Sequence, residues 1–538
     1  MRTLALWGQR LRRDWVQLLL WTVGTAALAY AAYIGVDQSY GNEQDRVVLL
    51  ATVMANPVIL LFRGLPSGAG DGAFITFLIF PWLAILASFM SSFLAVRHTR
   101  TEEETGRMEL VSATPASRWR PAAATILHGT AANLVLAVLT ALAFLAVGLP
   151  ADGAWLVGIA AGAVGLVFLG VGLVAAQLMR TSRGANSVSV AVLITTFLLA
   201  GIGNAAGTPS DDLQSMQSSW LTWLSPFGWG ENTRAFDQND WPPVALCAGA
   251  AVVLVAAALV LQAVRDVGAS LVPERHGRTD AGPLLSSTTG LVWRLTYPSI
   301  IGWAIAGILA GLLATSLSSV VEQMGGDNPA VAKVLESISG EGDLAQGVLV
   351  TFFVMLGIFA SCAAVQTVAR ARQEEAHGTA EMVLAQPVPR VRWLADFVVV
   401  GFVAVLVVVA SGIAGAAIGT AAAGAEASLV RDAVVSGAGQ VLAASVFLVL
   451  TALVFVLVPR ATIPAGWSLV MLAAIIGLFG PLFQFPDAVT DASPFSVAPI
   501  PIGDSVDWRG VWWLILAIAL GAAGSLALMR RRELATGG

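Results

Sequence analysis

The densest groups of ionisable side chains lie in two similar segments, residues 97–120 and 370–392. Both follow the pattern E-E-x-x-G-x-x-E-x-V-x-A-x-P-x-x-R. Residues seven apart return to the same helical face, so Glu102 and Glu109 are predicted to share one side of a short amphipathic helix with an acidic start and an apolar end. Such carboxylates suit electrostatic docking of a soluble partner. Because the pattern occurs twice in register, docking is favoured over the alternative of an ordinary solvated loop.

The positions shared by both segments define the candidate docking site. A proline lacks an amide donor and restricts the residue before it, so Pro115 is expected to end the first helix. The candidate residues are Glu102, Glu103, Gly106, Glu109, Pro115 and Arg118 in the first segment, and Glu374, Glu375, Gly378, Glu381, Pro387 and Arg390 in the second.

Sequence patterns that build common catalytic centres are missing. A phosphate-binding loop needs G-x-x-x-x-G-K-[ST], but the only lysine, Lys333, has no such surroundings. The sequence has neither H-E-x-x-H nor paired Cys/His metal ligands. His98 and His377 are expected in loops, His276 in a linker, and His128 packed within a helix. We therefore expect no enzymatic site, and no cofactor or metal on this chain itself.

The composition places the docking segments at the edge of a membrane. Of the 538 residues, 57% are hydrophobic and 12% are charged, and the mean hydropathy is +0.78. Soluble domains carry about 25% charged residues, so a soluble multidomain enzyme is excluded. A net charge of −5 gives no reason to expect nucleic-acid binding. Cys247 and Cys362 lie in apolar runs and are expected to be buried, reduced thiols.

Twelve uncharged stretches are long enough to cross a bilayer, which takes about 20 apolar residues in a helix. Cytoplasmic loops are enriched in Arg and Lys, and most of the 29 basic residues fall on one side if both termini are cytoplasmic. We therefore predict cytoplasmic N- and C-termini. The twelve stretches are residues 15–36, 72–96, 121–149, 153–179, 184–210, 242–264, 298–321, 344–369, 397–425, 433–459, 461–486 and 510–529.

The chain is an internal duplication. A shift of 272 residues places Arg100 on Arg372 and Gly106 on Gly378, and Ser225-Pro226-Phe227 recurs as Ser493-Pro494-Phe495. Six spans per half is an even number, so both halves enter from the same side and the repeats are parallel. The predicted fold is an all-α polytopic membrane protein, a pseudo-dimer of two six-helix repeats. The expected parts are an interfacial amphipathic helix at 1–14, a first half at 15–268, a cytoplasmic linker at 269–297 and a second half at 298–538.

These features resemble the fused twelve-span permease of ABC-2-type exporters, in the bacterial polyketide-antibiotic or multidrug export group. The resemblance rests on the duplicated loop, the Ser-Pro-Phe segments and Arg265-Asp266-Val267-Gly268 after the sixth span. It implies a type V (ABCG-like) exporter fold, with the duplicated loops as coupling helices. It also implies re-entrant helices at about 211–240 and 487–507. The second half departs from the family by ending in Arg530-Arg531-Arg532-Glu533.

By this resemblance the chain is a permease that moves amphipathic or hydrophobic, drug- or antibiotic-like compounds out of the cell. Two copies of a separate ATPase subunit, which hold the ATP and Mg²⁺, would power it from the inner (plasma) membrane of a bacterium. One alternative is a proton-coupled twelve-span secondary transporter, which should carry a buried carboxylate and a basic loop after its second span. Another is a lipid-modifying transferase, which needs a clustered polar catalytic set. The acidic loop and the absence of acids in mid-span favour the permease.

Overall fold

The computed structural model divides the chain into two compact units, Met1–His276 and Gly277–Gly538. Met1–His276 is unit 1, and Gly277–Gly538 is unit 2. The structure describes residues 3–54, 57–112, 119–266, 268–272, 282, 285–324, 344–423, 428–479, 486–503 and 505–533.

Within the described residues, twelve helices are long and apolar enough to cross a membrane, and they coincide with the twelve predicted stretches. Helices form because a chain in lipid must satisfy its backbone polar groups internally. The prediction of an all-α, multi-pass membrane protein is confirmed. The spanning helices are α1 (Thr3–Ser39), α4 (Asp71–Arg97), α7 (Arg120–Ala146), α8 (Ala151–Leu178), α9 (Ser182–Ala205) and α11 (Pro242–Val264) in unit 1, and α12 (Thr288–Met324), α14 (Leu344–Ala376), α16 (Arg390–Ala423), α17 (Ser428–Leu457), α18 (Thr462–Phe479) and α20 (Val511–Met529) in unit 2.

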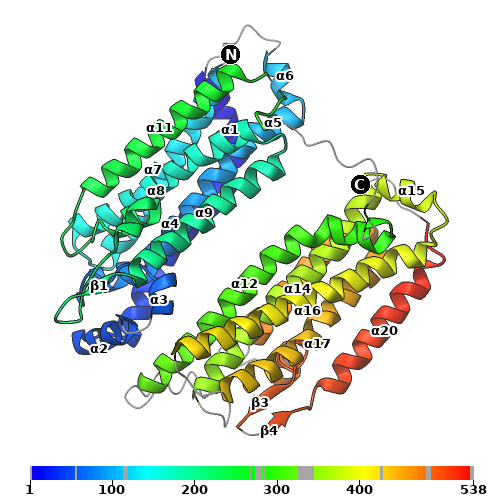
Figure 1. Ribbon diagram of the computed structural model, residues 1–538. Helices are drawn as coiled ribbons and strands as arrows, with labels where there is room; N and C mark the ends of the chain where they lie inside the picture. The colour runs from blue at the N-terminus through cyan, green and yellow to red at the C-terminus, as the bar shows by residue number, and fades with distance from the viewer. Residues whose placement is uncertain are drawn as a thin grey trace. The chain divides into compact units, whose positions relative to one another are not determined.

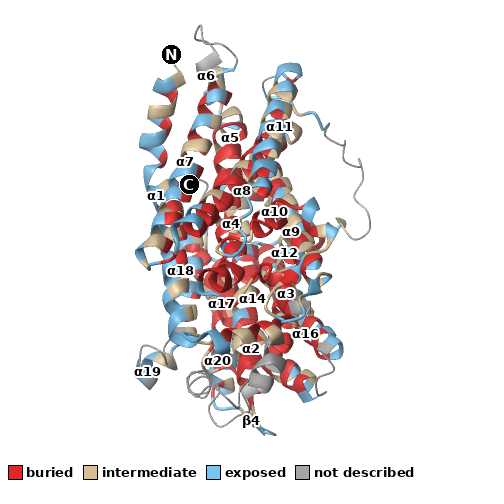
Figure 2. Ribbon diagram, turned by 90° about the vertical axis from the view of Figure 1, so that its left-hand side faces the viewer, coloured by how far each residue is buried: buried red, intermediate tan, exposed pale blue. Residues whose placement is uncertain are grey.

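In unit 1, α8 is the central helix. It contacts α4, α7, α9 and α11, while α1 packs against α7 and α4. Figure 2 shows α4 and α8 as mostly buried. Glycines allow this close packing, because a Cβ on Gly158 of α8 would lie 2.3 Å from the carbonyl oxygen of Ala137 on α7.

Unit 2 repeats this arrangement. Its central helix, α17, contacts α14, α16, α18 and α20, while α12 packs against α16 and α14. The central helix and the first helix of each unit thus contact equivalent neighbours in the two units. The predicted duplication therefore holds for the structure as well as for the sequence, because the two units have the same internal arrangement around their central helices.

The connections gather at the two ends of each unit (Figure 1). In unit 1, α5 (Arg100–Glu104) and α6 (Arg107–Ser112) lie at the end that carries the N-terminus, and α2 (Glu43–Met54) and α3 (Pro57–Phe62) lie at the opposite end. In unit 2, α15 (Thr379–Leu384) lies at one end and a small sheet at the other. The remaining elements are β1 (Thr208–Pro209), β2 (Met216–Gln217), η1 (Trp220–Leu224), α10 (Pro226–Glu231), η3 (Pro459–Ala461), α19 (Asp487–Thr490), β3 (Ile500–Ile502) and β4 (Ser505–Asp507).

Two small antiparallel sheets and the Ser-Pro-Phe turns stand before the last helix of each unit. Strand β1 pairs with β2, and β3 pairs with β4. The Ser225 hydroxyl donates a hydrogen bond to the carbonyl oxygen of Thr196 on α9 at 2.7 Å, and the Ser493 hydroxyl donates one to that of Ala473 on α18 at 2.8 Å. The expected re-entrant helix at 211–240 is reduced to η1 and α10. The described part of 487–507 forms the single-turn helix α19 and the β3–β4 hairpin.

Some expected boundaries differ from the structure. Residues 3–14 do not form a helix of their own but are the first turns of α1, where Arg10 and Asp14 are buried. Burial of these side chains against neighbouring helices favours one continuous helix. Helix α12 begins inside the expected linker 269–297, and the unit boundary after His276 also falls there. Both cysteines are buried and free.

Candidate functional site

A left-handed glycine divides each duplicated loop. Gly106 has φ +70° and Gly378 has φ +74°, a conformation that residues with a Cβ rarely adopt. Each glycine N–H donates to the carbonyl oxygen of the glutamate three residues earlier, at 3.1 Å in both loops. This turn ends the preceding helix, as left-handed glycines commonly do. The expectation of one helix that carries Glu102 and Glu109 on a shared face is therefore wrong, because α5 ends before Gly106 and α6 begins after it.

Glu103 holds the first loop through a buried ion-pair network. Its carboxylate accepts hydrogen bonds from Arg100 Nη1 at 2.7 Å and from Arg265 Nη2 at 2.6 Å. Arg100 Nε also donates to the carbonyl oxygen of Arg180, and Arg265 Nε donates to Gln177 Oε1. Glu103 thus ties α5 to the end of α8 and to the residue that follows α11.

Glu375 holds the second loop in the same way. Arg532 Nη2 lies 2.7 Å from each carboxylate oxygen of Glu375, and Arg372 Nη1 lies 3.5 Å from one of them. The Arg532 guanidinium also stands 4.3 Å from the centroid of the Phe455 ring. Arg532 therefore occupies the role that Arg265 has in unit 1. The altered end of the second half therefore still supplies an arginine for this ion pair. We call each pair a Glu–Arg clamp, formed by Glu103 with Arg265 in unit 1 and by Glu375 with Arg532 in unit 2.

The glutamates next to these clamps are also paired. Glu102 lies 3.2 Å from Arg10 Nη2 and 3.5 Å from Arg13 Nη1, which connects α5 to α1. Glu374 lies 2.7 Å from Arg370 Nη2 one helical turn earlier.

The remaining candidate residues differ in exposure. Glu109 on α6 and Glu381 on α15 are exposed, and each amide donates to the carbonyl oxygen of the preceding left-handed glycine at 3.2 Å. Beside Glu381, Met382 is 67% exposed. Pro387 and Arg390 are exposed, and α15 ends before Pro387, whereas Pro115 and Arg118 lie outside the described residues.

This difference separates two roles within the predicted docking set. The carboxylate of Glu375 has no exposed surface, and the side chain of Glu103 is 9% exposed. Neither can present its charge to a partner, so we assign both to holding their loops in place. Direct contact with a partner stays a prediction for Glu109 and Glu381.

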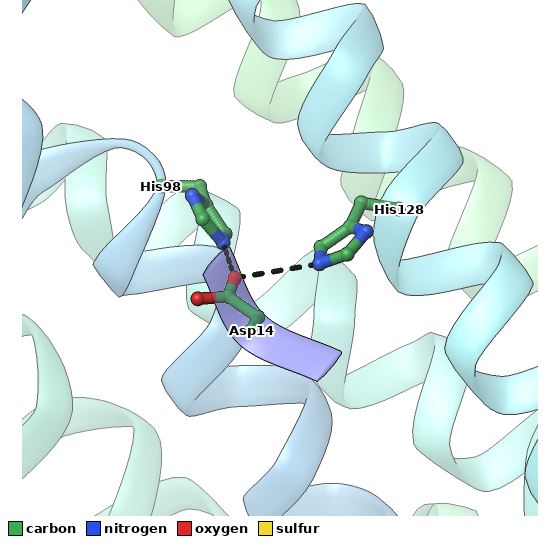
Figure 3. Close-up of side chains that lie close together, drawn as sticks. All are labelled: Asp14, His98 and His128. Atoms are coloured by element: carbon green, nitrogen blue, oxygen red, sulfur yellow. Dashed lines mark hydrogen bonds and ion pairs between the residues drawn. The ribbon is translucent and has the colours of Figure 1, made fainter. Parts of the chain in front are cut away.

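The structure also brings together a buried cluster that the sequence did not indicate (Figure 3). Asp14 of α1, His98 at the end of α4 and His128 of α7 face one another, and each is at most 4% exposed. Asp14 Oδ2 pairs with His98 Nε2 and lies 3.4 Å from His128 Nε2. His98 was expected in a loop and is instead fully buried. No local sequence signal links three residues on three different helices.

A second missed group is Glu231, at the end of α10. Its carboxylate accepts a hydrogen bond from Asn204 Nδ2 at 2.6 Å and is 7% exposed. Burial raises the pKa of Glu231 to about 8, against an ordinary value of 4.5. The chain therefore has a buried carboxylate, the feature expected of a proton-coupled transporter, although the spans themselves showed no acid in mid-span. Glu231 escaped notice because it lies between the apolar stretches. Asp396, directly before the predicted span 397–425, is likewise buried and accepts a hydrogen bond from Thr289.

Comparisons with known proteins match both units. A family profile described as "ABC-2 type transporter" matches residues 9–233, and one described as "Multidrug efflux system permease Rv1217c, C-terminal domain" matches residues 285–529. The multidrug efflux system permease protein Rv1217c of Mycobacterium tuberculosis (strain ATCC 25618 / H37Rv) is 33% identical over 545 residues, covering 98% of this chain and 95% of that protein.

Among solved structures, an inward-facing multidrug resistance MATE family transporter of the MOP superfamily matches at 14% identity. The match covers 94% of this chain and 96% of that one, but its TM-score of 0.35 is too low to indicate a shared fold. The family assignment rests instead on the near full-length relative and on the two profiles, which lie one in each unit. The chain therefore belongs to the ABC-2 type family of membrane permeases that includes Rv1217c.

Proposed function

We propose that this permease is the membrane subunit of an ABC exporter and that two copies of a separate ATPase subunit dock on α6 and α15. The observation that carries the proposal is the repeated construction of the two loops. Each has a left-handed glycine, a buried Glu–Arg clamp before it and an exposed glutamate after it. Two equivalent surfaces on one chain suit two copies of one partner.

The clamps explain how force on a loop would reach the spanning helices. In unit 1, Glu102 connects the loop to α1, Glu103 connects it to the end of α11, and Glu104 accepts a hydrogen bond from the Ser182 amide of α9 at 2.9 Å. A loop held on three helices moves them together. ATP binding by the partner can shift the permease between states only if the docked partner favours one of them.

The apolar outer surface of the helices and the similarity to Rv1217c support our proposal for the substrate class and the location. The outer helices expose apolar side chains, such as Val252 and Val253 on α11 at 69% and 66%. Charged groups in the spans are few, so an amphipathic or hydrophobic compound is the substrate we expect. Rv1217c is described as a multidrug efflux permease. We place the protein in the bacterial inner (plasma) membrane, with both termini and both docking loops in the cytoplasm.

Charge reversal at the two exposed glutamates tests the docking. The permease is co-expressed with an ATPase subunit from a neighbouring reading frame, and co-purification and stimulated ATP hydrolysis are measured. Glu109→Lys together with Glu381→Lys should reduce both at least tenfold, because like charges would oppose the partner's groups. The matched control is Asp37→Lys with Asp491→Lys, the same charge change at exposed positions outside the loops, in the last turn of α1 and directly after α19. Unchanged binding and stimulation in the loop variant would refute the proposal.

Buried Glu231 supplies one feature that a proton-coupled secondary transporter requires, so this second candidate needs its own test. Proteoliposomes with the permease alone are given a proton gradient and a fluorescent amphipathic substrate. We expect no gradient-driven transport, and we expect transport only when the ATPase subunit and ATP are present. Transport by the permease alone, lost in Glu231→Gln, would establish the secondary transporter instead.

A further inference from the structure

We propose that Asp14, His98 and His128 form a binding site for one divalent transition-metal ion, of which Zn²⁺ is the best chemical match. The three potential ligand atoms lie within 4.8 Å of one another, and all three residues are buried. Two imidazoles and one carboxylate are a common ligand set for Zn²⁺ sites with an open fourth position. The ligands come from α1, from the residue after α4 and from α7, so an ion would join three helices.

The second, independent observation is the state of His128. This side chain is 1% exposed, and within the described part of the chain neither of its ring nitrogens makes a hydrogen bond, so that Nε2 has only a long ion-pair contact with Asp14. Its Nε2 points at Asp14 Oδ2 from 3.4 Å (Figure 3). Buried polar groups in native proteins nearly always have a partner. A metal ion between His128 and Asp14 would supply one.

The surrounding charges orient the other two ligands. His98 Nδ1 lies 3.4 Å from Glu102 Oε1, which leaves His98 Nε2 directed at the centre of the cluster. A carboxylate on the far nitrogen of a metal-binding histidine is a recurring arrangement that fixes its tautomer. Arg97 Nη2 lies 2.9 Å from Asp14 Oδ1 and holds that oxygen, so Asp14 Oδ2 is the oxygen left for an ion. Arg10 faces Glu102 and thus offsets its charge outside the cluster.

The distances suit a four-coordinate ion after a small adjustment. Zn–N and Zn–O bonds of about 2.0–2.1 Å separate ligand atoms in a tetrahedron by about 3.4 Å. His128 Nε2 and Asp14 Oδ2 already have this separation. His98 Nε2 now contacts Asp14 Oδ2 directly and would move away slightly as the ion enters.

The three equivalent positions of unit 2 carry other residues. At the shift of 272 residues, the counterparts of His98 and His128 are Arg370 and Val400, and at the shift that aligns Trp21 with Trp303 the counterpart of Asp14 is Thr296. None of these three side chains is a usual ligand for Zn²⁺. The ion would therefore stabilise only unit 1. Its site adjoins the first docking loop, because the ligand His98 lies 3.4 Å from Glu102. The inference concerns metal binding alone and does not depend on the ATPase partner.

Metal titration of the purified full-length chain, without a polyhistidine tag, tests the site. After treatment with a chelator, the protein is titrated with Zn²⁺ by calorimetry and with Co²⁺ by visible absorption. We expect one Zn²⁺ per chain and the strong visible bands of four-coordinate Co²⁺. His128→Ala should weaken binding at least tenfold, and Glu102→Gln by roughly 10- to 100-fold as an outer-sphere change. The control is His377→Ala, an exposed histidine that should leave binding unchanged.

Asp14→Asn provides a second ligand variant of nearly the same shape if His128→Ala does not yield a monodisperse protein. Thermal unfolding adds an independent readout, because Zn²⁺ should raise the midpoint of the wild type but not that of a ligand variant. The proposal is overturned if the wild type binds less than one ion or gives no Co²⁺ bands. It is also overturned if a ligand variant binds as tightly as the wild type, which would place the ion elsewhere.

Discussion

Replacement of Glu375 by glutamine should destabilise unit 2 far more than the same replacement at its neighbour Glu374. Glu375 is fully buried and accepts two hydrogen bonds from Arg532, and Arg372 Nη1 lies 3.5 Å from its carboxylate. Glu374 pairs with Arg370, whose side chain is 23% exposed. The two substitutions have the same chemistry and adjacent positions, so their difference isolates burial of the ion pair.

The expected magnitudes follow from the environment of each pair. Removal of one partner of a buried ion pair leaves an uncompensated charge and destabilises a protein by about 3–5 kcal/mol. Two guanidinium groups, on Arg372 and Arg532, would remain buried beside the new amide, at 7% and 9% exposure. Glutamine keeps the volume of Glu375 and one acceptor, so we expect about 3 kcal/mol. A partly exposed pair such as Glu374–Arg370, with side chains 17% and 23% exposed, contributes about 0–1 kcal/mol.

Thermal unfolding of the detergent-purified protein, followed by tryptophan fluorescence, measures the difference. At about 2–4 °C per kcal/mol for a unit of this size, Glu375→Gln should lower the midpoint by roughly 6–12 °C. Glu374→Gln should lower it by no more than about 4 °C. Glu375→Gln combined with Arg532→Gln should lose less than the sum of the single variants, because the residues interact. Equal shifts for Glu375→Gln and Glu374→Gln, or strict additivity in the double variant, would refute the buried clamp.

Four further predictions follow from other parts of the structure. Gly378→Ala should cost about 1–2 kcal/mol and weaken ATPase co-purification, because φ +74° strains a residue with a Cβ. The control is Gly249→Ala, inside α11 with open space around it, which should not destabilise the protein. Ser493→Ala should lower stability by about 1 kcal/mol, through its lost hydrogen bond to α18, in the same unfolding assay. Burial raises the pKa of Glu231 from 4.5 in the unfolded chain to about 8 in the folded protein. The folded state therefore has its full stability below pH 4.5, where Glu231 is protonated in both states, and loses stability as the pH rises to about 8. Glu231→Gln should therefore match the wild type near pH 4.5 and melt higher at pH 8, whereas parallel pH profiles would contradict this burial. A cysteine at position 377 should react with a membrane-impermeant maleimide only from the cytoplasmic side. Labelling of intact cells from outside would show that the orientation in the membrane is the opposite of the one proposed.

Part of the candidate site was accessible from the sequence because it depends on local chemistry. Matched glycines with charged neighbours, such as Gly106 and Gly378, indicated a shared backbone, and both adopt the same left-handed turn. The prediction of a single amphipathic helix through Glu102 and Glu109 was wrong because of one of these glycines, Gly106. The spacing of seven residues was read as helical continuity, although the glycine between them is the residue that ends the helix.

The sequence by itself determined the twelve spans and the duplication. A bilayer of fixed thickness demands apolar stretches of fixed length, which is a local requirement that composition records. Only the tertiary structure decided which carboxylates are available to a partner. Glu103 and Glu109 are alike in the sequence, but Arg265, 162 residues away, reaches the first and leaves the second exposed. Desolvation and ion pairing depend on which distant residues the packed helices bring together, and for that reason the cluster of Asp14 with two histidines became visible only in the folded unit.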